Sequence, residues 1–394
     1  MARSLSPEQI PLGWSYGLLD NMVERVSGHT PNKSHPEYWN GGIKWISLSD
    51  SSRLDNGYIY ETDKEISELG IKNSSAQIHP AKTVVLSRDA GIGKSGVMAE
   101  PMAVSQHFIA WKCDNTKKMN SWYLYNWLQL HKREFERQAV GSTIKTIGLP
   151  YFKKLTIAAP PYQEQCKIAE ILSTWDKAIR NTKRLIENSK QQKKALMQQL
   201  LTGKKRLLDD SGKQFEGEWT KVELGKLLDY KQPTSYLVKS TEYSKGYSTP
   251  VLTAGKTFIL GYSNEDFGIF NEKLPVIIFD DFTTASKFVD FSFKAKSSAM
   301  KILVAKDGIS TKYVYESIQM LNYPVGGHQR HWISIFSNLV IGMPCKEEQR
   351  KIAAVLNNLD SENKILNKQL KDLKQEKKAL MQQLLTGKRR VKVD

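Results

Sequence analysis

Four short motifs carry residue types that could do chemistry. Gly91–Gly96 fits the G-x-G-x-x-G pattern of nucleotide-phosphate loops. Ala159–Tyr162 has the form of a four-residue loop whose leading polar side chain holds an amino group for methyl transfer. His328 with His331 could ligate a metal ion, and the acidic pair Asp280–Asp281 could belong to a nuclease. Each chemistry also needs particular neighbours, and these decide whether the motif can work.

The neighbours of all four motifs argue against catalysis. A phosphate loop must open a helix, but Pro101 and a non-helical pattern follow the glycines. Ala159 has no polar side-chain atom that could hold an amine. The histidine pair lacks a third ligand, and the acidic pair lacks the Glu/Asp-x-Lys partner of a nuclease. We predict plain turns at the glycines and the acidic pair, a helix start after Ala159, and no catalytic, metal or cofactor site.

The composition predicts a large globular protein. Its 394 residues are too many for one ordinary core, and the hydrophobic content of 40% suffices for two domains or more. No apolar run approaches the roughly 20 residues of a membrane span, and the N-terminus lacks the apolar stretch of a signal peptide. Three widely spaced cysteines argue against a disulfide scaffold. We expect a cytoplasmic chain with no membrane partner.

The net charge of +17 favours a polyanionic partner such as nucleic acid. Residues 160–206 carry 11 basic and 4 acidic side chains, and residues 344–394 carry 13 and 7. Residues 207–343 are neutral, with 15 of each sign. Most of the excess charge therefore lies in two short segments.

These two segments are copies of one sequence. KKALMQQLLTGK occurs at Lys193–Lys204 and again at Lys377–Lys388, and 23 of the 47 positions from Pro160 to Arg206 match the later copy without a gap. Apolar residues recur at alternating steps of four and three from Ile168 and from Ile352, as in a coiled-coil seam. We predict two helices of about 60 Å, from a rise of 1.5 Å per residue.

Equal length makes the two helices the best partners for each other. The alternatives are that each lies on its own domain or dimerises between chains. Asn363 and Lys377 interrupt the apolar seam and are candidates for fixing its register. Strand-like segments at Thr83–Asp89 and Pro275–Asp281 place a globular domain before each helix.

The predicted fold class is α+β. Two α/β-type domains with the same order of elements but little identity are joined by two long antiparallel helices, which form an intramolecular coiled coil in a pseudo-twofold repeat. The predicted boundaries are 1–159 for the first domain, 160–203 for the first helix, 204–218 for a linker, 219–343 for the second domain, 344–387 for the second helix and 388–394 for a basic tail.

Polar loops at corresponding places in both domains suit a nucleic-acid reader, which needs donors and acceptors beside backbone-binding cations. Gln329 has the geometry to read adenine and Arg330 to read guanine. An ordinary solvated loop remains the alternative for each residue. The full set of predicted DNA-binding residues is Arg88, Lys94, Ser95, Ser142, Thr143, Lys145, Lys256, Thr283, Thr284, Lys287, His328, Gln329 and Arg330.

Duplicated helices with P-x-x-EQ-x-KIA at their start and LLTGK at their end, attached to unlike domains, resemble the specificity subunit of a type I restriction-modification system. The resemblance covers essentially the whole chain. It rests on Pro160, Glu164, Gln165, Lys167, Ile168 and Ala169, matched by Pro344, Glu348, Gln349, Lys351, Ile352 and Ala353.

The resemblance implies a non-catalytic subunit with two target recognition domains, each reading one half of a split sequence in double-stranded DNA. The helices would hold the domains apart and dock two methyltransferase subunits, which bind S-adenosylmethionine; a separate restriction (motor-nuclease) subunit would cleave. The second domain is similar to domains that read a GAA-like trinucleotide. The alternatives are a self-contained DNA adenine methyltransferase and a non-specific nucleic-acid-binding coiled-coil protein.

Overall fold

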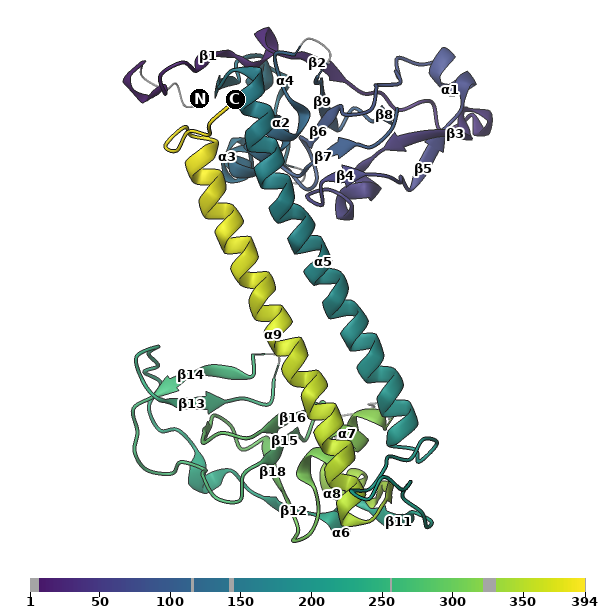
Figure 1. The fold of residues 1–394 in the computed structure, drawn as a ribbon, viewed down its shortest axis with the longest axis vertical. Helices are drawn as coiled ribbons and strands as arrows, with labels where there is room; N and C mark the ends of the chain where they lie inside the picture. The colour runs from purple at the N-terminus through teal and green to yellow at the C-terminus, as the bar shows by residue number, and fades with distance from the viewer. Residues whose placement is uncertain (1–6, 115–116, 142–144, 256, 322–330, 394) are drawn as a thin grey trace. The chain divides into compact units, whose positions relative to one another are not determined.

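A computed structural model describes residues 7–114, 117–141, 145–255, 257–321 and 331–393 (Figure 1). The chain forms two compact units. Unit 1 comprises Met1–Lys183 with Lys368–Asp394, and unit 2 comprises Arg184–Asn367. We call the globular part of unit 1 before residue 160 head 1, and residues 219–343 of unit 2 head 2. Within the described residues, no helix has the length and apolarity needed to cross a membrane.

Two long helices dominate the secondary structure. They are α5 (Tyr162–Leu200) and α9 (Lys346–Leu384), of 39 residues each. Each begins just after a proline, where a missing backbone N–H costs nothing. Each is followed by a glycine with a left-handed φ, +71° at Gly203 and +68° at Gly387, which is the usual way to end a helix. The predicted start of a helix after Ala159 is confirmed.

The helices pair with each other in antiparallel fashion inside each unit (Figure 1). In unit 1, Ile168 and Leu172 of α5 share a core with Met381 and Leu384 of α9. In unit 2, Leu200 shares a core with Ile352 and Leu356. The seam predicted from the apolar spacing is therefore buried, and the intramolecular pairing is confirmed.

Polar residues of the seam contact one another across the helix pair. The Lys377 ammonium lies 2.7 Å from a carboxylate oxygen of Asp176 in unit 1. The repeat places the same pair in unit 2, where Lys193 lies 2.6 Å from Asp360. Asn363 Nδ2 donates to Ser189 Oγ at 3.0 Å. These contacts are satisfied in one register only, because a slip would leave the polar groups against apolar side chains.

Head 1 contains a larger sheet of strand order β2-β9-β6-β7-β4, a smaller sheet of order β5-β3-β8, and a ribbon of β1 with β10. Helix α2 packs against the larger sheet and completes its core. The strands are β1 (Ser15–Leu18), β2 (Glu24–Ser27), β3 (Trp39–Ile46), β4 (Tyr58–Ile59), β5 (Lys64–Ile66), β6 (Val84–Ser87), β7 (Ser95–Met98), β8 (Ala103–Val104), β9 (Phe108–Lys112) and β10 (Thr156–Ala159). The helices are α1 (Glu68–Lys72), α2 (Ser121–Leu130), α3 (Lys132–Gln138) and α4 (Leu149–Lys153).

Head 2 repeats this plan with the sheet orders β12-β18-β15-β16 and β14-β13-β17 and a ribbon of β11 with β19. Its strands are β11 (Thr220–Glu223), β12 (Leu228–Lys231), β13 (Thr249–Leu252), β14 (Ile259–Ser263), β15 (Val276–Asp280), β16 (Ser286–Val289), β17 (Lys294–Ala295), β18 (Met300–Ala305) and β19 (Val340–Met343). Its helices are α6 (Leu224–Leu227), α7 (Thr311–Met320) and α8 (His331–Ser334). The expected common order of elements is confirmed for the strands that the two heads share, while β4 and α1 of head 1 have no counterpart in head 2.

A duplicated glutamine attaches each head to its long helix. Gln165 of α5 accepts a hydrogen bond from the backbone N–H of Asn120, the N-cap of α2, at 2.9 Å. Gln349 of α9 accepts from Ser310, the N-cap of α7, at 3.2 Å. Both glutamine side chains are nearly fully buried, so the repeated sequence also determines how each head begins its main helix.

A duplicated ion pair joins the end of one long helix to the start of the other. Arg390 binds Glu164 through two hydrogen bonds of 2.7 Å in unit 1. Arg206 binds Glu348 in the same way in unit 2, also at 2.7 Å. Such paired donors fit a carboxylate with little freedom of orientation. The hydrogen bonds that Arg206 donates to Glu348 and Arg390 donates to Glu164 raise the pKa of both arginines, which stay charged.

His79 of head 1 is wholly buried, and neither ring nitrogen has a hydrogen-bond partner among the described residues. Burial, helped by the charge of Lys112, lowers its pKa from 6.5 to about 4. The folded state therefore takes up this proton only below pH 4, whereas the unfolded chain takes it up below pH 6.5.

Head 1 is expected to lose stability as the pH falls from 6.5 towards 4, by up to about 3 kcal/mol at 1.36 kcal/mol per pKa unit. Urea denaturation at pH 7 and pH 5, with hydrogen exchange of head 1 amides, measures this loss. The variant His79→Leu should lose about 2 kcal/mol less over that interval. Equal losses in both proteins would show that His79 does not titrate in this way.

Candidate nucleic-acid interface

The loop after the central strand of head 1 is a turn. Strands β6 and β7 are antiparallel neighbours, and residues 88–94 connect them. Gly91 and Gly93 have left-handed φ values of +79° and +77°, which explains why glycines stand there. No helix follows, so the predicted plain turn is confirmed.

This turn contacts the segment before the last strand of head 1. Arg88 Nε donates to the carbonyl oxygen of Ile147 at 3.1 Å, and Thr146 Oγ1 donates to the carboxylate of Asp89. Lys145, next to Thr146, is exposed. The structure thus brings together Arg88 and Lys145, which lie in the two loops predicted to bind DNA.

Lys94 and Ser95, which the sequence predicted to bind DNA, form hydrogen bonds with other residues of head 1 instead. Lys94 Nζ donates to the backbone oxygen and to Oγ of Ser51, both at 3.0 Å. Ser95 lies in β7 with a fully buried side chain, and its Oγ accepts from Gln129 at 2.8 Å. The predicted loop position of Ser95 is therefore wrong, because helix α2 covers this end of the strand and supplies its hydrogen-bond partner.

Helix α3 adds cations that the sequence analysis missed. Gly93 packs so closely on it that an added Cβ would stand 3.1 Å from the Cγ of Lys132. Only Phe135 of α3 is buried, while Arg133 and Arg137 are exposed. In the sequence, α3 is a short charged stretch with one aromatic residue, Phe135. Such a stretch is typical of an ordinary solvent-exposed helix, so it gave no indication of a DNA contact.

Head 2 has a hairpin in the corresponding place. Residues 281–285 join the antiparallel strands β15 and β16. Asp280 holds this turn through hydrogen bonds to the backbone N–H of Phe282 at 3.0 Å and to Thr283 Oγ1 at 2.7 Å. Thr284 has a left-handed φ of +58°, and its N–H donates to the Asp280 carbonyl at 2.9 Å. The acidic pair is thus part of a turn, as predicted.

Asp281, the second residue of the acidic pair, contacts helix α8 near the end of head 2. Asp281 is buried and accepts a hydrogen bond from the backbone N–H of Trp332 at 2.9 Å. It also faces the buried ammonium of Lys301 at 3.8 Å. Thr283 and Lys287 remain exposed, although Lys287 belongs to β16 and not to the loop. An aspartate after the central strand therefore anchors the later loop segment in both heads.

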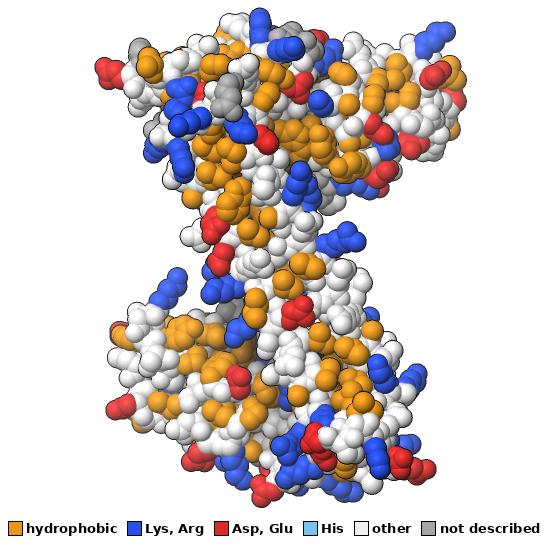
Figure 2. Space-filling model, in the orientation of Figure 1, with side chains coloured by type: hydrophobic (Ala, Val, Ile, Leu, Met, Phe, Trp, Pro, Cys, Tyr) orange, Lys and Arg blue, Asp and Glu red, His pale blue; other side chains and the backbone are white. Residues whose placement is uncertain are grey.

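Six of the predicted DNA-binding residues lie outside the described residues. They are Ser142, Thr143, Lys256, His328, Gln329 and Arg330. Among the residues that are described, no group of three His, Cys, Asp or Glu side chains could hold a metal ion. On the face shown in Figure 2, Lys and Arg side chains are spread over both units among acidic and apolar ones.

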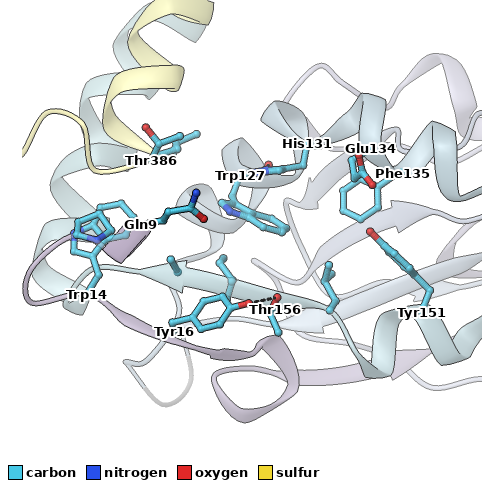
Figure 3. Close-up of a pocket in the computed structure, with 15 residues that line it drawn as sticks. Gln9, Trp14, Tyr16, Trp127, His131, Glu134, Phe135, Tyr151, Thr156 and Thr386 are labelled. Atoms are coloured by element: carbon cyan, nitrogen blue, oxygen red, sulfur yellow. Dashed lines mark hydrogen bonds between the residues drawn. The ribbon is translucent and has the colours of Figure 1, made fainter. Parts of the chain in front are cut away.

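An aromatic cavity of about 280 Å³ lies elsewhere in unit 1 (Figure 3). Trp14, Tyr16, Trp127 and Tyr151 line it, together with the end of α9. Tyr16 donates to Thr156 Oγ1 at 3.1 Å. Burial raises the pKa of Tyr151 to about 12, so its phenol stays protonated at neutral pH. None of the described residues predicted to bind DNA lines this cavity.

Comparison with known families accounts for the duplicated architecture. The family model of the type I restriction modification DNA specificity domain matches residues 11–190 and again residues 216–375. The chain belongs to this family. Each match covers one head and most of the long helix that follows it, so the repeat seen in the sequence is a repeat of the family's own domain.

Named relatives share this assignment. The chain is 52% identical over 145 residues to the EcoR124I/EcoR124II specificity subunit of Escherichia coli, a match that covers 36% of this chain and 35% of that protein. The chain thus spans about a third of that relative. It is 22% identical over 429 residues to the MjaVIII specificity subunit of Methanocaldococcus jannaschii, covering 98% of this chain and 95% of that one.

Solved structures share the fold. The S subunit of a type I restriction-modification system from M. genitalium has a TM-score of 0.64 at 15% identity, covering 98% of this chain and 99% of that one. A chain from a structure of the assembly and conformational transition of a type I system has a TM-score of 0.53 at 14% identity, covering 95% and 98%. At these identities the likeness concerns the fold alone.

Proposed function

We propose that the chain is the DNA sequence-specificity subunit of a type I restriction-modification complex and carries no catalytic centre of its own. The observation that carries this proposal is the pair of heads whose sheets share one strand order, apart from the additional edge strand β4 of head 1, but whose loops differ. Because the two heads carry different side chains in corresponding loops, each head can recognise a different DNA half-site. Residues 1–159 and 219–343 would be the two recognition domains, and the asymmetric pair predicts an asymmetric, bipartite target.

The partners follow from the family. Two methyltransferase subunits, which bind S-adenosylmethionine, and a restriction subunit would assemble with the chain on double-stranded DNA. The repeat supports two copies of one partner, because the helix ends of unit 1 and unit 2 carry the same residues and the same Arg–Glu contact. The long helices would also set the number of unread base pairs between the half-sites.

The contact with DNA is proposed for side chains in and beside the loops after the two central strands, of which Arg88 and Thr284 are half-buried and the others exposed. In head 1 these are Arg88 and Lys145, with Arg133 and Arg137 added by the structure. In head 2 they are Thr283, Thr284 and Lys287. Lys94 and Ser95 would instead support the loop of head 1 through Ser51 and Gln129. The other predicted residues, Ser142, Thr143, Lys256, His328, Gln329 and Arg330, stay candidates for base contacts.

Methylome sequencing tests the function. Cells that express the chain with its methyltransferase subunits should gain one bipartite adenine-methylated motif, which is absent without the chain. A chain that lacks one heptad from each long helix should keep both half-sites and change their spacing, since each helix shortens by about 10 Å. Failure to gain any motif would contradict the proposal. Methylation by the chain alone would instead support a self-contained methyltransferase.

The cations of head 1 are expected to act on DNA affinity and not on sequence preference. The double variant Arg137→Ala, Lys145→Ala should weaken binding of the assembled complex to all duplexes and lower the slope of log K against log salt by about 1 per lost phosphate contact. Fluorescence anisotropy at several salt concentrations measures the slope. Lys72→Ala, at an exposed lysine of α1, is the matched control. If the double variant keeps the wild-type slope of log K against log salt, Arg137 and Lys145 do not contact the DNA backbone.

A further inference from the structure

Phe282 is exposed at the tip of the β15–β16 hairpin, with 44% of its surface open to solvent. Among the described residues, its ring stacks on no other aromatic ring and lies against no cation. Phe267 of head 2 is 46% exposed, but its ring lies under the ammonium groups of Lys239 and Lys294, at 4.9 and 4.2 Å. The open Phe282 ring is next in sequence to Thr283, one of the residues proposed to contact DNA.

The turn that carries Phe282 is rigid. Its own backbone N–H and the neighbouring Thr283 hydroxyl are both bound to Asp280, at 3.0 and 2.7 Å. The next residue on the other side, Asp281, is buried and bound to Trp332. Because both carboxylates hold the backbone, the ring is presented in a defined place, and little conformational entropy is lost when it binds.

We propose that Phe282 is a base-contacting residue of head 2 and packs against the 5-methyl group of a thymine in its half-site. This inference rests on the proposed function. Phenylalanine is one of the side chains that make apolar contact with this methyl group in the major groove. Thr283 and Thr284 follow Phe282; the Thr284 hydroxyl can contact the same base-pair edges, and Thr283 Oγ1, which donates to Asp280, can accept a hydrogen bond from them. Phe282 thereby distinguishes thymine from cytosine, which lacks the methyl group.

The surroundings favour a base over a protein partner. Thr283 within the turn and Lys287 in β16 beside it are exposed and match the mixture of base-edge and phosphate contacts in DNA interfaces. Head 1 has no aromatic residue in its turn at 88–94. The contact therefore belongs to one half-site and not to a surface common to both heads.

Replacing thymine by deoxyuridine removes only the methyl group and tests the contact. The assembled methyltransferase complex would be titrated with a duplex that carries the motif from methylome sequencing, and with duplexes in which each thymine of the head 2 half-site is singly replaced. We expect one replacement to weaken wild-type binding about fourfold, as burial of one methyl group predicts. The variant Phe282→Ala should bind the parent duplex at least about fourfold more weakly than wild type does. Its affinity should not change when that thymine is replaced by deoxyuridine.

Two further variants test whether a loss of binding comes from the lost contact or from misfolding of head 2. Phe282→Leu keeps an apolar side chain and should retain most of the discrimination. Phe291→Ala removes a phenylalanine that is 36% exposed beyond the other end of β16, and should discriminate as wild type does. The inference is overturned if wild type ignores every replacement, if its half-site has no thymine, or if Phe282→Ala keeps the full discrimination. Absence of any preferred duplex would instead contradict the proposed function.

Discussion

Replacing Glu316 by alanine is expected to lower the free energy of unfolding of unit 2 by about 3–5 kcal/mol, the usual cost of breaking a buried ion pair on one side. Glu316 of α7 is fully buried and lies 3.0 Å from Lys193 of α5 and 2.7 Å from Lys312 of its own helix. Both lysines also lie 2.6 Å from Asp360 of α9. Alanine would leave two largely buried ammonium groups facing one carboxylate.

The charge states support this expectation. Burial opposes the charge on Lys312, but hydrogen bonds to Asp360 and Glu316 outweigh it and raise the lysine's pKa. Burial also opposes the charge on Asp360, yet the hydrogen bonds from Lys193 and Lys312 lower that carboxyl's pKa. Lys312 and Asp360 are therefore both charged at neutral pH.

Denaturant titration of the full chain, with hydrogen exchange to assign the loss to unit 2, measures the effect. Glu223→Ala is the matched control, since Glu223 pairs with Lys226 at 3.3 Å on the exposed surface and should cost at most about 1 kcal/mol. Equal losses in the two variants would show that the buried network contributes no more than a surface pair.

Replacing Arg206 by alanine is the second change with a large expected effect, again about 3–5 kcal/mol in unit 2. The Glu348 carboxylate is fully inaccessible and, among the residues that the structure describes, would keep only the Trp219 indole N–H, at 3.3 Å, as a hydrogen-bond donor. Arg206→Lys should recover part of the loss, because lysine keeps the charge but cannot form the two parallel hydrogen bonds.

A double variant distinguishes two causes of the stability loss in Arg206→Ala: the buried charge left unpaired on Glu348 and the lost packing of the arginine side chain. Adding Glu348→Gln to Arg206→Ala removes the buried negative charge and should restore a large part of the stability, as measured by a double-mutant cycle. The repeat supplies an internal comparison, since Arg390→Ala should destabilise unit 1 through Glu164 in the same way. A variant Arg206→Ala as stable as wild type would show that water replaces the guanidinium at no cost.

The long helices and their pairing were predictable because their signals are local. A repeat offset of 184 residues, an apolar step of four and three, and a glycine after the last turn can each be recognised without knowing what lies nearby in space. Asn363 and Lys377 could likewise be identified as polar interruptions of the seam. What they contact, Ser189 and Asp176, follows once the antiparallel register is known.

The heads were harder to predict because the exposure of a loop side chain depends on distant residues. Lys94 is engaged by Ser51, 43 residues away, and Ser95 by Gln129, 34 residues away. The sequence around the glycine motif contains no sign of either partner. For the same reason the exposed arginines of α3 were missed, since only the packing of Gly93 on Lys132 and Phe135 brings that helix against the loop.

The sequence by itself determined the duplicated scaffold, its α+β class and the family, since these depend on periodicity, capping and direct identity between the copies. The tertiary structure alone decided which loop residues can meet a ligand. Ser95 is withdrawn into the core, whereas Phe282 is held open by Asp280. The physical reason is that burial and hydrogen bonding are properties of neighbours in space, and strand pairing brings those neighbours from far along the chain.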